Sequence, residues 1–578
     1  MPWRVATTEE VWHNGLQYTR PLSTGASGTL LEDLDLHRSV DEQARELVRR
    51  LLNVLEDVRA DLRAAQAENQ RLREEINRLK GEQGRPKVQS NPPQPPRTDH
   101  SSAQERHRAK TWSKRRTPDR IPLDRAQGVE VDPDRVPPDA VCKGYEAVVV
   151  QDVICRTDNV LCHQEKFSSP SQPPTSLAAL PQGDSGHWGP GLTSLALVLD
   201  SGAQMSEPKV AEVWRSVGVD LSDGQVSHLL SKDQAAFHAE QDALDRAGVA
   251  RSPWQHLDDT STRVNGPHGS CPIVCTPLST ASCTTPATDR LTVIDVLPTH
   301  RPRRFLVHEE ARGDVEGCGV SAVRRRQLGQ WPSGTSMAEA TMPALLAAHR
   351  PGVGPPPRHG SLRATAVAAS HAALECPVGR LLVGDDAPQC TLVTDELALC
   401  WVHEGRHAKQ LRPDVSHHRA LVEDFRQRFW TSYDQWWACR AQPTPEEAAR
   451  LERECAALGA TVTGSEALDE RRAKTHAKQA CLLMVLAHPE IPRHNNPAAL
   501  GARARVRQRE VSFGPRTREG ANAWDTFMTL AGTATKLGIS FSHSIHDRVS
   551  GAYQMPALAD LIAERAKDLN LGASWDTS

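Results

Sequence analysis

A run of apolar residues with a seven-residue repeat constrains the fold of this 578-residue chain most strongly. The repeat fills residues 41–82, and charged residues flank its apolar positions. Its a positions hold Val48, Leu55, Leu62, Asn69 and Ile76, and its d positions hold Leu51, Val58, Ala65, Leu72 and Leu79. A 3.5-residue period kept over five heptads predicts a coiled coil rather than a helix packed on its own domain, and one Asn at an a position favours a parallel dimer.

Composition and charge narrow the class of protein. The formal net charge is -3, so the chain as a whole has no basic bias toward nucleic acid. Only local clusters of basic residues can attract it. No stretch has the apolar length of a membrane span, and the N-terminal residues lack the apolar core of a signal peptide. Thirteen cysteines without a framework spacing favour reduced thiols. We therefore expect a cytoplasmic protein without a membrane partner.

Changes in composition predict the order of segments. We expect a disordered tail at 1–40, the coiled coil at 41–82, a basic Pro-rich linker at 83–140, a small β-containing region at 141–200, a helix-turn-helix at 201–250, a core at 251–515 and a C-terminal helical region at 516–578.

Shorter patterns predict individual elements. Residues 144–168 suggest a small hairpin, and strand-like apolar runs lie at 272–276, 291–297 and 378–384. The Pro- and Gly-rich residues 352–361 suggest irregular backbone inside a weakly helical stretch at 300–375. Helices are expected at 522–537 and 556–569.

Two segments have patterns typical of DNA binding. The linker contains a basic cluster around Trp112 that includes Lys114, Arg115 and Arg116, which suits a phosphate backbone as well as a solvated linker. Residues 206–232 predict two short helices around Gly218, with Ser206 and Ser222 as caps and Val210, Val213, Trp214, Val226, Leu229 and Leu230 facing inward. Gln225, Ser227 and His228 are then exposed toward base edges, unless the pair is a helical hairpin without DNA.

Paired aspartates end two apolar stretches, HLDDT at 256–260 and LLVGDD at 381–386. Aspartates commonly end strands, so either pair alone is weak evidence of a site. Carboxylates from two strands can nevertheless hold Mg²⁺ ions, which prefer oxygen ligands. Such ions clamp the attacking and leaving oxygens of a phosphodiester in line.

Three long segments carry a family resemblance. Residues 202–230, 392–411 and 488–520 closely resemble bacterial transposases of the insertion-sequence-sixty-six family, in the same order along the chain. The resemblance implies a multidomain α/β protein with a coiled coil, a helix-turn-helix and a ribonuclease-H-like catalytic core with a helical insertion at about 300–375. It also implies an Asp-Asp-Glu triad that binds Mg²⁺ or Mn²⁺.

The resemblance assigns the site residues one by one. Asp258 matches the first acid, and Asp385 or Asp386 matches the second. The third falls in an Asn-Asn-x-x-Glu pattern, in which this chain has Ala499, expected at the third position of a helix capped by Asn496. Glu490, Glu404 and Glu396 are the nearby carboxylates, and none sits at the family position. His403 and Arg406 match a further signature near the site, while Arg503 and Arg507 follow Ala499 at four-residue steps and offer charge to phosphates.

The aromatic content is only 4%. Where relatives tend to carry Tyr or Phe, this chain has Asp200, Ser201, Asp245, Cys155, Cys162 and Cys390. The resemblance therefore implies an eroded copy, although a GC-rich host with a tolerant core is an equal explanation.

The functional expectation is a transposase that cuts and joins DNA, impaired by the loss at Ala499. Its partners are the inverted-repeat ends of its element, target DNA and a second copy of itself, and its place is the bacterial nucleoid. The rival expectations are a non-catalytic DNA-binding dimer that represses transposition and a decayed product.

Overall fold

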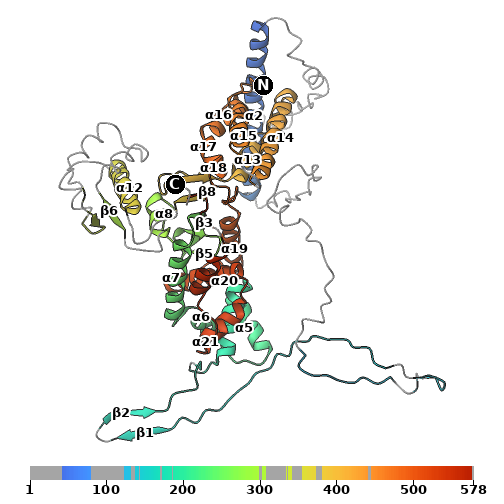
Figure 1. Cartoon of the computed structure of the whole chain (residues 1–578), viewed down its shortest axis with the longest axis vertical. Coiled ribbons are helices and arrows are strands. Elements are labelled where there is room, and N and C mark those ends of the chain that lie inside the picture. The colour runs from blue at the N-terminus through green and yellow to red at the C-terminus, as the bar shows by residue number, and fades with distance from the viewer. Residues whose placement is uncertain are drawn as a thin grey trace, which may run out of the picture.

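The chain is a mixed α/β protein built around one five-stranded sheet (Figure 1). The structure is a computed structural model, and it describes residues 42–79, 123–131, 134, 137–141, 144–169, 172–184, 186–297, 303–306, 334, 336–341, 355–372, 380–440, 444–569 and 571–575. The expected tail at 1–40 lies outside the described residues, as does the basic cluster in the linker.

The central sheet has the strand order β5-β4-β3-β8-β9. Its strands are β3 (Trp254–Arg263), β4 (His268–Cys275), β5 (Thr280–Ser282), β8 (Leu381–Gly384) and β9 (Glu396–Leu399). β3, β4 and β5 pair antiparallel, whereas β3, β8 and β9 run parallel. All four residues of β8 are buried, as expected for an inner parallel strand covered on both faces.

The expected strand at 291–297 is wrong, because these residues form the helix α8 (Arg290–Val296). Asp289 starts the helix, since its side chain accepts a hydrogen bond of 2.9 Å from the backbone N–H of Thr292. A short, wholly apolar run carries no periodicity that separates strand from helix. The Asp289 cap therefore favours a helix over a strand for these residues.

The expected irregular backbone at 352–361 is also wrong in part. Helix α12 (Pro355–His371) begins inside this stretch. Prolines are tolerated in a first helical turn, where their missing N–H has no helical partner to lose. α12 contacts the short strand β6 (Arg304–Leu306), which pairs with β7 (Ser336–Ala338) beside the central sheet.

A layer of helices, which the sequence patterns did not predict, follows β9. It comprises α13 (Trp401–Gln410), α14 (Ser416–Cys439), α15 (Pro445–Ala460), α16 (Glu466–Ala477), α17 (Gln479–Leu482) and α18 (Met484–Ala487). Aromatic residues fill its core: Trp401, Phe425, Phe429, Tyr433 and Trp436. These aromatic side chains bury large apolar areas in the core of the layer.

Helix α19 (Asn496–Ser512) returns from this layer to the sheet and packs across β3 and β4. Ala498 and Ala502 lie in a buried cluster with Ile273 of β4. The approach is close at Gly501, since a Cβ there would lie 2.7 Å from the Ile273 Cγ2 atom. Small residues thus set the distance between α19 and the sheet.

The expected helix-turn-helix and C-terminal region share one helical core. α4 (Pro190–Leu197), the π-helical turn η4 (Val198–Gly202), α5 (Glu207–Ser216), α6 (Asp223–Ser231) and α7 (Ala235–Ala250) precede the sheet, and α20 (Arg518–Leu537), α21 (Phe541–Val549) and α22 (Leu558–Lys567) follow it. Phe237 of α7, for example, contacts Phe527 of α20, with ring centroids 5.1 Å apart. Segments far apart in the sequence therefore form one unit.

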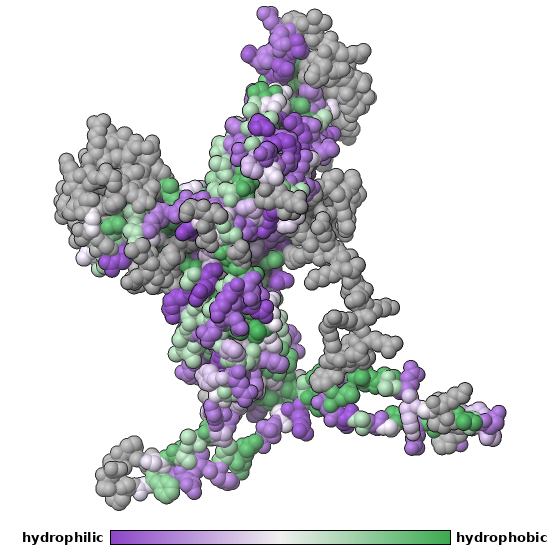
Figure 2. All heavy atoms as spheres, viewed as in Figure 1, coloured by the Kyte–Doolittle hydropathy of each residue, from purple (hydrophilic) through white to green (hydrophobic). Residues whose placement is uncertain are grey.

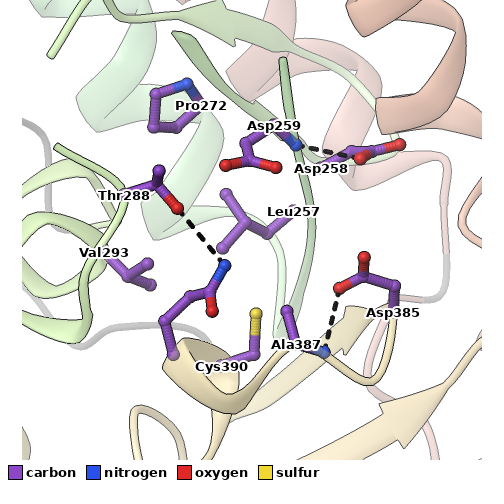
Figure 3. A pocket seen from close by; sticks show the side chains of 10 residues that line it. Leu257, Asp258, Asp259, Pro272, Thr288, Val293, Asp385, Ala387 and Cys390 are labelled. Atoms are coloured by element: carbon purple, nitrogen blue, oxygen red, sulfur yellow. Dashed lines mark hydrogen bonds between the residues drawn. The ribbon is translucent and has the colours of Figure 1, made fainter. Parts of the chain in front are cut away.

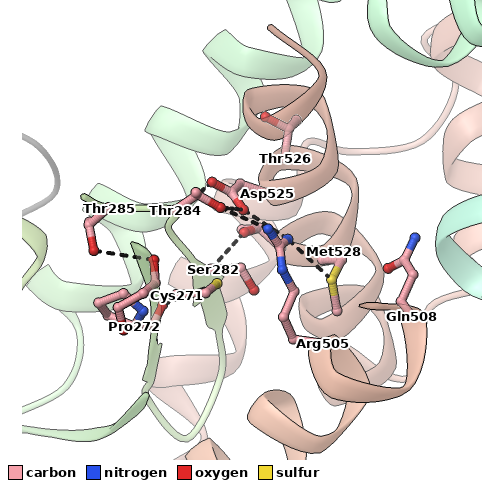
Figure 4. Close-up of polar contacts among 12 residues, drawn as sticks. Cys271, Pro272, Ser282, Thr284, Thr285, Arg505, Gln508, Asp525, Thr526 and Met528 are labelled. Atoms are coloured by element: carbon pink, nitrogen blue, oxygen red, sulfur yellow. Dashed lines mark hydrogen bonds and ion pairs between the residues drawn. The ribbon is translucent and has the colours of Figure 1, made fainter. Parts of the chain in front are cut away.

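A buried ion pair ties this helical unit to the sheet through α19 (Figure 4). The Arg505 guanidinium is fully buried and lies 2.9 Å from the Asp525 carboxylate. It also donates a 2.7 Å hydrogen bond to the Thr284 hydroxyl and lies 3.6 Å from the ring centre of Trp524. Such a pair is tolerated in a dry interior because each charge has several partners.

Helix α2 (Glu42–Leu79) covers the predicted heptads. Its first part packs on its own chain, because Leu52 is buried against Val415 with Val48 and Leu55 beside it. Glu56 accepts backbone hydrogen bonds from Asp414 and Val415 (2.9 and 2.7 Å), where α14 starts without a side-chain cap of its own. The remaining heptad stripe is exposed to solvent: Leu51, Val58, Leu62, Leu72, Ile76 and Leu79.

The hairpin expected at 144–168 is displaced along the chain. Residues 144–165 form no helix or strand, and the hairpin consists of β1 (Lys166–Ser169) and β2 (Gln172–Leu177). Figure 2 shows hydrophobic side chains along these extended segments, away from the body of the molecule. Val150 and Ile154 are among them, with 84% and 81% of their surface exposed.

Among the helices of the described residues, none is both long and apolar enough to cross a bilayer.

Candidate functional site

The two acidic islands meet at the centre of the sheet. β3 and β8 are parallel neighbours, with Trp254 opposite Leu381 and His256 opposite Val383. This register has an offset of 381 − 254 = 127 residues, and the same offset places Asp258 level with Asp385. Figure 3 shows both carboxylates on one side of β3, with Asp259 on the other, as alternation along a strand requires.

The register and the side-chain contacts distinguish Asp385 from Asp386. Asp385 is half-buried and accepts a 3.2 Å hydrogen bond from the backbone N–H of Ala387, which fixes the turn after β8. Asp386 is exposed and forms an ion pair with Lys478. Asp385 is therefore the residue that accompanies Asp258, and the sequence alone left this choice open.

Asp258 lies in a negative environment. The pKa of Asp258 is raised to about 6, mainly by burial and in addition by the charges of Asp385 and Asp259. The backbone N–H of Asp259, 2.9 Å from the Asp258 carboxylate, and the Arg406 guanidinium act in the opposite direction. Carboxylates whose charges repel one another favour the uptake of a proton or a cation.

The position expected for the third acid lies on the first turn of α19. The N-cap is Asn495 and not Asn496 as the sequence suggested, so Pro497 is the second helical residue and Ala499 the fourth. The Asn495 side chain does not cap the helix. Its amide donates a 2.6 Å hydrogen bond to the carbonyl of Leu257, directly before Asp258.

Asn495 and its partner His256 are site residues that the sequence patterns did not single out. The Asn495 Oδ1 atom lies 3.2 Å from the His256 Nδ1 atom, and the Asn495 backbone N–H contacts the Cys400 sulfur at 3.2 Å. Burial lowers the pKa of His256 to about 3, so the imidazole is neutral. Together these contacts fix the first turn of α19 beside Asp258.

The other nearby carboxylates have partners elsewhere. Glu490 accepts hydrogen bonds from the backbone and hydroxyl of Ser574 (3.0 and 2.7 Å). Glu404 is buried and accepts 2.5 Å hydrogen bonds from Arg471 and Thr475. Glu396 lies 2.9 Å from His488. All three carboxylates are therefore engaged by other residues.

Helix α13 brings two further polar residues toward the acidic pair. Burial lowers the pKa of His403, Arg406 lowers it further, and the charge of Asp385 opposes both effects. The His403 Nδ1 atom is buried and has no hydrogen-bond partner among the described residues. Arg406 is exposed. A buried ring nitrogen without a hydrogen-bond partner among the described residues and an exposed guanidinium suit a polar ligand near the acidic pair.

The donor set determines which cation fits. A small pocket is lined by Asp258, Asp259, Asp385, Thr288, Gln389 and Cys390. In the part of the chain that the structure describes, no three His, Cys, Asp or Glu side chains are arranged to hold a metal ion. Two carboxylates with water fit one hard divalent cation such as Mg²⁺, which keeps several waters when bound. A second cation would need a further anionic ligand.

The two helices at 206–232 form as the patterns indicated, with differences in detail. Ser222 and Gln225 form a reciprocal capping box, whereas the Ser206 side chain makes no cap. Val213 is exposed, and Ala211 is buried in its place. His228 is exposed and Ser227 half-exposed, but the Gln225 side chain is held by the Ser222 backbone N–H at 2.7 Å.

The predicted phosphate contacts divide into two groups. Lys114, Arg115 and Arg116 lie outside the described residues. Arg503 and Arg507 are exposed on α19, four and eight residues beyond Ala499. Positive charge therefore follows the helix that starts beside Asp258.

Comparison with known proteins gives one similar sequence. Over 187 residues, 32% of this chain, it is 35% identical to an uncharacterized protein, y4jO, of Sinorhizobium fredii (strain NBRC 101917 / NGR234). The match covers 58% of the length of that relative. No family model and no solved structure matches the chain. The name of the relative states no activity, so the match carries no function.

Proposed function

We propose that this chain is a DNA transposase of the insertion-sequence-sixty-six type that has lost most or all of its strand-cleaving activity. The observation that carries the proposal is the register of β3 and β8, which sets Asp258 level with Asp385 on neighbouring parallel strands. The mixed sheet, in which β3 pairs antiparallel with β4 and parallel with β8, supports a ribonuclease-H-like core. The resemblance of three long segments to that family supports the same conclusion.

The proposed roles follow from position. Asp258 and Asp385 hold Mg²⁺ or Mn²⁺, and a bound divalent cation would supply charge stabilisation for in-line displacement at a phosphodiester. The charge of Asp385 acts on His403 and the charge of Arg406 acts on Asp258, so both side chains are assigned to the phosphate. Arg503 and Arg507 bind the backbone further along α19, which positions the DNA without selecting a sequence.

The missing third carboxylate limits catalysis. Ala499 offers no ligand, and the nearby Glu490, Glu404 and Glu396 are bound to other groups. A site with two carboxylates can hold one divalent cation. Its affinity for that cation is lower than the affinity of a three-carboxylate site, which can hold two. Each 1.4 kcal/mol or so of lost transition-state stabilisation slows the reaction about tenfold. We therefore expect no measurable cleavage from the chain as it stands.

DNA recognition is proposed for α5 and α6 as a helix-turn-helix. Ser227 and His228 on α6 are the side chains available to base edges, because Gln225 is engaged in the capping box. Lys114, Arg115 and Arg116 of the linker would add phosphate contacts. The partners in this proposal are the inverted-repeat ends of the element and its target DNA, which places the protein at the nucleoid in the bacterial cytoplasm.

A parallel homodimer is proposed through α2. The heptad stripe beyond Val58 is exposed, with Leu72 and Ile76 each about half accessible to solvent. Apolar residues at a and d positions are stable in water only when they face a second helix. Since Val48 and Leu55 pack on Val415 of the same chain, the pairing is expected over the later heptads.

A second candidate function is a non-catalytic DNA-binding dimer that occupies the element ends and represses transposition. Ala499 favours this candidate, because it removes a ligand and leaves α2, α5 and α6 unaffected. A decayed product is the third candidate, and two acids favour it, the buried Asp245 and the half-buried Asp200. Burial raises the pKa of both Asp200 and Asp245 to about 7, as expected for carboxylates in sites that suit apolar side chains.

The test is a cleavage assay on the element ends with Mg²⁺ or Mn²⁺. Three proteins are compared: the chain as it stands, Ala499→Glu, and Ala499→Glu combined with Asp258→Asn. The proposal expects cleavage only in the single variant. Cleavage by the unchanged chain would refute the claim of impairment, and cleavage by the double variant would refute the role of Asp258. DNA retention without cleavage by all three would favour the repressor.

A further inference from the structure

The two adjacent aspartates after β8 have opposite surroundings. The charge of Asp385 acts on Asp258, and among the described residues its carboxylate accepts a hydrogen bond only from the backbone N–H of Ala387. Asp386, the next residue, is paired with the ammonium of Lys478, which lies between α16 and α17. A sequence with two consecutive acids thus presents one of them to the site and holds the other in an ion pair.

The ion pair of Asp386 belongs to a charge-balanced cluster. The Lys478 Nζ atom also lies 3.8 Å from the Glu404 carboxylate, which in turn accepts a 2.5 Å hydrogen bond from Arg471. Two anions therefore face two cations. Asp258 has no such ion pair among the described residues, and the positive charge that acts on it comes from the exposed Arg406.

The cluster also joins separate parts of the chain. Glu404 lies on α13 and is buried, Arg471 lies on α16, and Asp386 follows the end of β8. Lys478 links this helical layer to Asp386, two residues beyond the end of β8, in addition to the 2.9 Å hydrogen bond from the Cys400 backbone N–H to the Gly384 carbonyl. Its side chain is 21% exposed, compared with 44% for Asp386.

We propose that Lys478 is a positioning residue that determines which of the two aspartates binds the divalent cation. By neutralising Asp386, it leaves Asp385 as the ligand that accompanies Asp258. Without the Lys478 ammonium, Asp386 becomes an unpaired carboxylate next to the ligand Asp385 in the sequence. Asp386 then competes with Asp385 for the cation. This inference rests on the proposed function, because it requires a cation at Asp258 and Asp385.

The experiment measures Mn²⁺ binding to the full-length chain by the loss of the free-ion electron paramagnetic resonance signal. Asp386→Asn is compared in two backgrounds, the natural Lys478 and Lys478→Met. With Lys478 present, Asp386→Asn should change Mn²⁺ affinity little. In the Lys478→Met background the same change should weaken Mn²⁺ by about tenfold, the low end of the effects typical of groups that orient metal ligands.

Three further proteins complete the design. Lys478→Arg keeps the positive charge and should behave like the natural chain. Lys474→Met is the matched control, because Lys474 pairs with Glu470 on the exposed side of α16 and removing it should leave the Asp386 effect unchanged. Asp258→Asn should abolish most of the Mn²⁺ binding. Circular dichroism confirms that each variant is folded.

The outcomes separate the inference from the proposed function. An Asp386→Asn effect that is equal in the two backgrounds, whether large or absent, refutes the role of Lys478. Mn²⁺ binding that is insensitive to Asp258→Asn refutes the proposed metal site, and the inference with it. Mn²⁺ binding that requires Asp258, combined with an Asp386 effect that appears only without Lys478, supports both.

Discussion

Replacement of the buried Asp245 by Asn should stabilise the helical unit at neutral pH. Asp245 lies on the buried face of α7 and is 5% exposed. Its Oδ1 atom has no hydrogen-bond partner among the described residues. Burial raises the pKa of Asp245 from 3.8 to about 7, the charge of Asp242 adds to this effect, and Gln241 and Arg246 oppose it.

The pH dependence follows from the sign of this shift. The folded state holds the proton more tightly than the unfolded state, so folding carries no penalty below pH 4. The penalty grows as the pH rises toward 7 and is constant above it. A difference of about three pKa units corresponds to roughly 4 kcal/mol as an upper limit, at about 1.4 kcal/mol per unit.

Urea unfolding followed by circular dichroism at pH 5 and pH 7.5 measures this penalty. Asp245→Asn should raise the free energy of unfolding by about 1–3 kcal/mol at pH 7.5, less than the limit because the amide is also incompletely bonded, and by less at pH 5. Asp200 has a similarly raised pKa and leaves some pH dependence in both proteins. Asp158→Asn is the control, because Asp158 is exposed and lies in the segment 144–165, which forms no helix or strand. A variant no more stable than the natural chain at pH 7.5 would refute the reasoning.

The remaining predictions concern the ion pair, the metal site and the dimer. Arg505→Met should lower the free energy of unfolding by about 3–5 kcal/mol because it leaves Asp525 charged and buried, and urea titration should show most of the loss recovered when Asp525→Leu is added. Since Asp258 has a pKa of about 6, Mn²⁺ affinity measured by calorimetry should rise as the pH increases toward 6 and level off above it, and a flat profile would contradict this. In the full chain, Leu72→Asp should convert a two-chain species into a single chain in sedimentation, whereas a natural chain that sediments as a monomer at micromolar concentration would exclude the α2 dimer.

The sequence predicted those parts of the fold and of the site that depend on local patterns. The apolar run before Asp385 ends as a buried strand at Gly384, and the heptads form one helix over Glu42–Leu79. The run at 291–297 was assigned to the wrong element, because a short apolar stretch fits a strand or a helix equally well. There Asp289 was the available signal, since Asp is a preferred N-cap residue.

Other features depend on contacts between residues far apart in the sequence. The choice between Asp385 and Asp386 follows from the register with β3 and from Lys478, 92 residues away. No periodicity encodes either contact. Likewise, the heptad positions Val48 and Leu55 look identical to the later ones, and only the contact with Val415 separates the docked part of α2 from its exposed part.

The attachment of α19 explains how a fold of this kind can persist without a third acid. The helix is held by the Asn495 amide on the Leu257 carbonyl, by the packing of Ala498 and Ala502 on Ile273, and by the Arg505 ion pair. None of these contacts involves the side chain at position 499. A change from a carboxylate to Ala there removes a metal ligand and leaves the packing of the helix intact. In the proposed transposase, catalysis and folding would therefore depend on different residues of the same helix, so loss of the first would not force loss of the second.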